Sequence, residues 1–122
     1  MKAITYDTSQ AGLEAVLRVW QIKSLQVLWN SPVGAKSFTV WQNVNQILKG
    51  ETISRASVIN FLEDMRELGV LSGVQESGKG GYHWVYSPAM NETEFKRYIA
   101  DTVLGRLAKE FPDEANKAIN AL

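Results

Sequence analysis

Two short runs of β-favouring residues, 70–76 and 82–86, flank the glycine-rich stretch SGKGG at residues 77–81. Glycine reaches the positive φ values that a tight hairpin turn requires, and Val, Tyr and Trp are common in strands. The pattern therefore predicts a β-hairpin, which ends at Pro88. A phosphate-binding P-loop is excluded, because that motif lies between a strand and a helix, whereas here a strand follows the loop.

Three segments with apolar residues at helical spacing precede the hairpin. We expect one long helix over residues 12–30, a helix of about three turns that begins with Ser37 as its N-cap, and a third helix over residues 54–69. Ser54 is suited to cap the third helix, and Gly69 fits the position just after its end. The buried face of the third helix is expected to consist of Val58, Phe61, Leu62, Met65 and Leu68.

Two further helices, over residues 92–111 and 112–122, are expected after the hairpin. The order helix, helix, helix, hairpin, helix, helix predicts a mainly α fold with a small β-hairpin, in the α+β class. A three-helix core whose third helix runs into a hairpin is the winged helix-turn-helix arrangement. We therefore expect a winged helix-turn-helix DNA-binding domain over residues 1–88 and a C-terminal helical dimerisation element over residues 89–122.

The helix at residues 92–111 carries an apolar and aromatic stripe that has two interpretations. The stripe packs on the core of its own chain, or it forms a two-fold interface with a second copy. The candidate interface residues are Phe95, Tyr98, Ile99, Val103, Leu107 and Phe111.

Length and composition limit the possible functions. The chain has 122 residues, 13 Lys and Arg against 13 Asp and Glu, and no cysteine. Its length suits about one domain, and its balanced charge offers no broad positive field to attract a polyanion. Without cysteine, disulfides, thiolate zinc sites and cysteine nucleophiles are excluded. No signal peptide or membrane-spanning run is recognisable, so we expect a cytoplasmic protein without membrane contact.

No group of residues suggests catalysis. His83 is the only histidine, so a usual zinc site cannot form, and no Ser-His-Asp order is recognisable. Glu63 and Asp64 are adjacent on a predicted helix, where their side chains diverge by about 100°. The two carboxylates therefore cannot act together as general acid and general base. We therefore expect no enzyme activity, metal or cofactor.

The outward face of the third helix carries residues suited to reading bases. A recognition helix enters the major groove by its N-terminal turns, where Arg55, Ser57 and Asn60 would meet base edges. The competing interpretation is a solvated face of an amphipathic helix. Contacts with the DNA backbone are expected from the start of the second helix and from the hairpin, through Lys36, Ser37, Lys79 and His83.

Several short motifs resemble the penicillinase-repressor (BlaI/MecI) family of winged-helix transcriptional repressors. They are LQVLW at residues 25–29, Ser54 with Ser57-Val58, Leu62, Gly69-Val70-Leu71 and Tyr86-Ser87-Pro88, and together they lie within about residues 15–110. The resemblance implies a homodimer that binds double-stranded DNA in a sequence-specific manner. It also implies that the third helix is the recognition helix and that the C-terminal helices form the dimerisation element.

The chain departs from the family pattern in the third helix. It has Glu63-Asp64 where the family usually has Arg, and Leu68 where the family often has Lys. The alternative is therefore a winged-helix protein-interaction module that does not bind DNA, whose third helix carries the acidic residues Glu63, Asp64 and Glu67. Glu63 and Glu67 are expected to point away from the core. A third possibility is a small-ligand sensor with a pocket between the first helix and the C-terminal helices.

Overall fold

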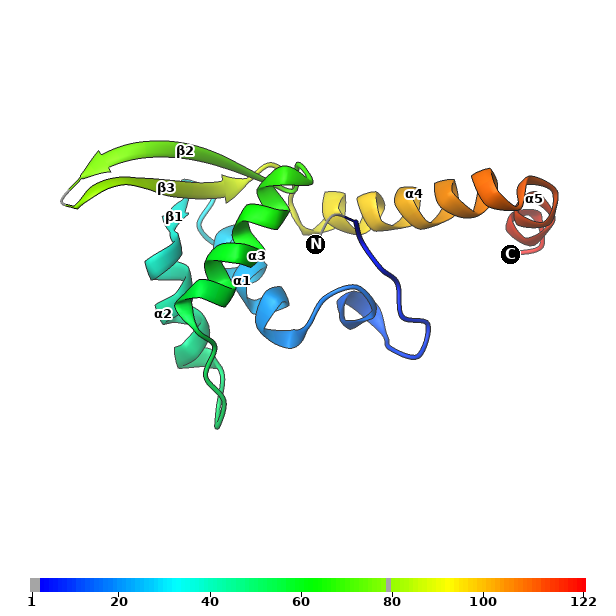
Figure 1. The fold of residues 1–122 in the computed structure, drawn as a ribbon. Coiled ribbons are helices and arrows are strands. Elements are labelled where there is room, and N and C mark those ends of the chain that lie inside the picture. The colour runs from blue at the N-terminus through cyan, green and yellow to red at the C-terminus, as the bar shows by residue number, and fades with distance from the viewer. Residues whose placement is uncertain (1–2, 79) are drawn as a thin grey trace. The chain divides into compact units, whose positions relative to one another are not determined.

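The computed structural model describes residues 3–78 and 80–122, and over these residues it has five α-helices, one 3-10 helix and a three-stranded antiparallel sheet (Figure 1). The predicted α+β class is therefore confirmed. The chain falls into two compact units, Met1–Asn91 and Glu92–Leu122, which we call the N-terminal and C-terminal units. The elements are η1 Gly12–Ala15, α1 Val19–Trp29, β1 Ala35–Lys36, α2 Ser37–Ile47, α3 Arg55–Glu67, β2 Leu71–Gly78, β3 Gly81–Pro88, α4 Glu92–Glu110 and α5 Pro112–Asn120.

The core of the N-terminal unit is formed by α1, α2, α3 and the start of the hairpin. Each helix contributes apolar residues about one turn apart, so each has one buried face. The residues at this core that are at most 2% exposed include Leu25, Leu28, Val40, Val44, Val58, Phe61, Leu62, Met65, Val70, Leu71 and Tyr86. The buried face predicted for α3 is confirmed except at Leu68, which follows the helix and is only partly buried.

The long helix predicted for residues 12–30 is wrong. A 3-10 turn at Gly12–Ala15 is followed by a break, and α1 begins only at Val19. Arg18 has extended backbone angles, φ −76° and ψ 159°, and its N–H donates to the Gln21 side chain at 2.8 Å. A glutamine at this position satisfies a backbone donor at the helix start, which favours a new start over continuation.

The caps of α2 and α3 differ in how well the sequence predicted them. Ser54 caps α3 as expected, because its hydroxyl accepts from the Ser57 N–H at 3.1 Å. Gly69 has a φ of 82° just after the end of α3, which confirms its predicted role. The predicted cap of α2 is wrong by one residue, since Lys36 is the N-cap and Ser37 is the first helical residue.

The sheet contains a strand that the sequence did not predict. The hairpin pairs β2 with β3 from Leu71↔Pro88 to Gly78↔Gly81, and β1 then adds to the free edge of β3 (Figure 1). Just before β1, Gly34 has a φ of 102°, and a Cβ there would lie 2.9 Å from the Tyr86 carbonyl oxygen. Only glycine allows this close approach, which places the start of α2 beside the hairpin.

Polar and aromatic side chains form contacts between the hairpin and α3. The Tyr86 hydroxyl donates to Glu63 Oε1, while Arg66 Nη2 donates to Glu63 Oε2 at 2.8 Å. The Arg66 guanidinium in turn lies over the Trp84 ring, 4.6 Å from its centroid. Glu63 was expected to point away from the core, and this expectation is wrong, because both of its carboxylate oxygens have partners within the N-terminal unit.

This contact network shifts the pKa values of its members. Burial by itself raises the pKa of Glu63, but hydrogen bonds from Arg66 and Tyr86 outweigh it, and the pKa lies below its usual value. Burial and the Glu63 carboxylate both raise the pKa of Tyr86. The charged form of Glu63 is therefore the one that the fold favours.

The C-terminal unit consists of α4 and α5. Pro112 occupies the first turn of α5, where its missing N–H costs nothing, as expected. Over the part of the chain that the structure describes, no helix is long and apolar enough to cross a membrane.

The network gives a pH prediction. Because the pKa of Glu63 is lower in the folded chain than its ordinary value of 4.5, the stabilisation is present above that pH and is lost as pH falls below it. We expect Glu63→Gln to lower the free energy of unfolding at pH 7 by about 1–3 kcal/mol. The variant should also lose less stability than the unchanged chain between pH 6 and pH 3, as measured by urea unfolding. An equal loss in both chains would contradict this role of Glu63.

Candidate nucleic-acid interface

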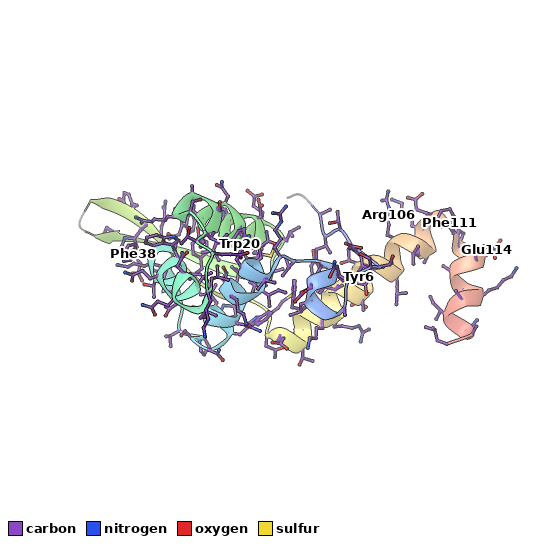
Figure 2. All side chains as sticks on the ribbon, turned by 90° about the horizontal axis from the view of Figure 1, so that it is seen from below. Tyr6, Trp20, Phe38, Arg106, Phe111 and Glu114 are labelled. Atoms are coloured by element: carbon purple, nitrogen blue, oxygen red, sulfur yellow. The ribbon has the colours of Figure 1, made fainter. Side chains whose placement is uncertain are left out.

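Three elements of the N-terminal unit line an open depression of about 260 Å³. It lies between the start of α2, the start of α3 and the tip of the hairpin, and Phe38 of α2 is labelled in Figure 2. Four of the residues predicted to contact DNA, Lys36, Ser37, Arg55 and His83, meet here. The lining residues are Lys36, Ser37, Phe38, Arg55, Gly80, Gly81, Tyr82 and His83. Lys79, predicted to contact the DNA backbone, lies outside the described residues.

The start of α2 presents backbone donors at this depression. Lys36 has extended angles, φ −74° and ψ 155°, and no side chain caps the helix. The N–H groups of a first helical turn have no partner within the helix, and the helix dipole makes this end positive. With Ser37 and Phe38 in the lining, the depression combines these donors with the Lys36 cation, a combination that favours an anion.

Arg55 is held beside α2 by aromatic contacts. Its guanidinium carbon lies 5.2 Å from the centroid of the Phe38 ring, and Phe38 packs against Trp41 with 5.6 Å between ring centroids. Trp41 Nε1 donates to the Ile53 carbonyl at 2.7 Å. Arg55 itself stays exposed, so its orientation is supported while its donors remain accessible.

Asn45 fixes the connection between α2 and α3. Its side-chain oxygen accepts from the Ile53 N–H at 2.9 Å, and its Nδ2 donates to the Ile53 carbonyl at 3.2 Å. One amide thus satisfies both backbone groups of a residue that lies two positions before Arg55. The sequence did not indicate this role, because an Asn on a helix face carries no pattern that reveals a backbone partner beyond its own helix.

The predicted base-contacting residues differ in accessibility. Arg55 and Asn60 are exposed on α3. Ser57 is half-buried, and its hydroxyl is 2.8 Å from the Ser54 hydroxyl, with which it shares a hydrogen bond. Ser57 and Asn60 lie on α3 outside the lining of the depression. The structure therefore brings Arg55 together with the predicted backbone contacts and leaves Asn60 as a separate exposed side chain.

His83 packs across the hairpin. It pairs with Glu76 in the sheet, and its Nε2 lies 3.9 Å from Glu76 Oε2, which is too far for a hydrogen bond. Nε2 is buried and has no hydrogen-bond partner among the described residues. The same part of the chain contains no group of three or more His, Cys, Asp or Glu residues that could hold a metal ion.

The predicted dimer residues fall into two groups. Phe95 and Ile99 are buried, and Tyr98 and Val103 are half-buried. Leu107 and Phe111 are exposed by 42% and 60%, and Phe111 lies between α4 and α5. Leu104, which the sequence analysis did not select, is also exposed. The accessible apolar surface is therefore at the C-terminal end of α4.

Comparison with known protein families, curated proteins and solved structures found no match to this chain.

The role of Asn45 is testable with a neighbouring asparagine as control. Asn45→Ala leaves the Ile53 N–H without its partner, although the Ile53 carbonyl still accepts from Trp41 Nε1, and we expect it to lower the free energy of unfolding by about 1–3 kcal/mol. Asn43 donates a hydrogen bond to the Thr39 carbonyl of its own helix, so Asn43→Ala should change stability by about 0.5 kcal/mol or less. Chemical denaturation measures both, and equal effects would exclude the proposed role of Asn45.

Proposed function

We propose that this chain is a dimeric winged-helix protein that binds double-stranded DNA in a sequence-specific manner and represses transcription by occupying an operator. The arrangement of elements supports the proposal. α2 and α3 are joined by a short connection, α3 leads directly into the β2–β3 hairpin, and β1 completes the sheet (Figure 1). In the winged helix-turn-helix arrangement the second helix of the pair enters the major groove.

The single observation that carries the proposal is the charge of the depression. Lys36 and Arg55 line it together with the positive end of α2, and none of its described lining residues is Asp or Glu. A DNA phosphate placed there would meet the Lys36 cation and backbone donors at once. Arg55 and Asn60 would then face base edges, Arg suited to guanine and Asn to adenine.

The position of Glu63 removes one of the three acidic residues from the alternative protein-interaction surface, while Glu67 stays exposed on α3. Its charge is paired with Arg66 and hydrogen-bonded by Tyr86. The departure from the repressor-family pattern at this position therefore adds little negative field to the proposed reading face.

The proposed dimer uses the exposed apolar end of the C-terminal unit. Leu104, Leu107 and Phe111 present large apolar side chains to solvent in a single copy. A two-fold contact would cover them and would pair two DNA-binding units, as palindromic operators require.

DNA binding is tested by salt titration with a random duplex, followed by selection of bound sequences. We expect Lys36→Ala to weaken binding to all sequences and to reduce the salt slope by about one. Arg55→Ala should weaken binding and relax sequence preference at one position by about 1–3 kcal/mol. Arg97→Ala is the control, because Arg97 is an exposed cation of α4 that pairs with Asp101. If the unchanged chain shows neither specific nor salt-sensitive binding at micromolar concentration, the proposed function is wrong.

Dimerisation is tested separately. Leu107→Glu places a charge in the proposed apolar contact, and we expect it to shift the chain to monomer in sedimentation velocity. Thr93→Glu is the matched control at an exposed position near the start of α4 and should leave the oligomeric state unchanged. A monomeric unchanged chain at about 100 μM, well above typical micromolar dissociation constants, would contradict the dimer.

A further inference from the structure

The depression has aromatic side chains in addition to the cations that would bind a phosphate. Besides Lys36 and Arg55, three aromatic side chains line it, namely Phe38, Tyr82 and His83. Tyr82 is 77% exposed, so most of this residue is accessible to a ligand. Large aromatic side chains in water cost free energy unless a partner covers them, and a flat ring beside cations is the surface on which nucleobases stack.

We propose that the depression binds a nucleoside monophosphate unit, with the phosphate at Lys36 and Arg55 and the base stacked on Tyr82. The phosphate would occupy the positive end of α2, where Ser37 begins the helix without a side-chain cap. Arg55, whose guanidinium carbon lies over the Phe38 ring, is exposed and accessible to the ligand. No described lining residue carries a negative charge that would repel the phosphate.

The size of the depression limits the ligand. Its volume of about 260 Å³ lies just below the range of about 300–1,000 Å³ that is usual for small-molecule pockets. It therefore accommodates at most about one nucleotide, with part of the nucleotide surface in solvent, and not a dinucleotide cofactor. The ligand is either a free nucleotide or one unpaired nucleotide within a strand, because the two share this chemistry.

The inference does not rest on the proposed binding of duplex DNA, since a mononucleotide has no duplex to recognise. It adds a consequence to that function. A nucleotide that occupies Lys36 and Arg55 would compete with duplex DNA for the same cations.

The test is isothermal titration of the full chain with thymidine 5′-monophosphate, with inorganic phosphate and with thymidine. We expect the monophosphate to bind at least about tenfold more tightly than either part alone, because phosphate and base contacts act together. Tyr82→Ala should weaken monophosphate binding by about 5- to 150-fold and leave phosphate binding unchanged. Lys36→Ala should weaken both. Tyr6→Ala is the control, because Tyr6 is an exposed tyrosine outside the depression.

A short oligothymidylate distinguishes the two sources of the ligand. If the association constant of the oligothymidylate exceeds that of the monophosphate by a factor larger than its number of nucleotides, the ligand is a strand. If the association constant per nucleotide is equal for both, the ligand is a free nucleotide. Equal affinities for the monophosphate and inorganic phosphate, or unchanged monophosphate binding in Tyr82→Ala, would overturn the inference. Duplex binding by the unchanged chain is measured apart from this titration, so the failure of one proposal does not imply the failure of the other.

Discussion

The Glu63 carboxylate is the contact on which the arrangement of the N-terminal unit depends. It accepts from Tyr86 of the hairpin and from Arg66 of its own helix, and Arg66 covers Trp84 of the hairpin. A hairpin alone is marginally stable in water, so its position depends on contacts with the rest of the unit, and this network adds to the burial of Val70, Leu71 and Tyr86 in the core. A partly buried carboxylate with both oxygens satisfied is stable in its charged form and restricts the geometry of its donors. The acidic residue that looked unsuited to a DNA reader thus has a structural role.

The depression depends on the same arrangement and on two further residues, Gly34 and Asn45. Gly34 lets β1 pair with β3, which brings the start of α2 to the hairpin, and Asn45 fixes the connection that leads to Arg55. Lys36, Arg55 and His83 are far apart in the sequence, and they line one surface only because these contacts hold three elements together. The positive and negative charges balance over the whole chain, but cations are in excess at the depression. A small phosphate-binding surface requires such a local excess.

The sequence predicted those features that depend on local pattern. Apolar spacing gave α3, the Ser54 and Gly69 signals gave its ends, and the glycine-rich turn gave the hairpin. It did not predict the break before Val19, where the Gln21 side chain competes with a continued helix, nor β1, which has only two residues and depends on pairing with a distant strand. Lys36, Ser37, Arg55 and His83 could be selected as candidate residues, but the aromatic contribution of Phe38 and Tyr82 to their site could not, because it depends on tertiary packing.

The central claim is that duplex DNA contacts the starts of α2 and α3 and the hairpin. The most direct measurement is an amide NMR titration of the full chain with a mixed-sequence duplex at low salt. The account predicts the largest shifts at residues 37–39, 55–60 and 80–83, which include the described tip of the hairpin. Absence of shifts at these residues, or shifts confined to the C-terminal unit, would contradict it.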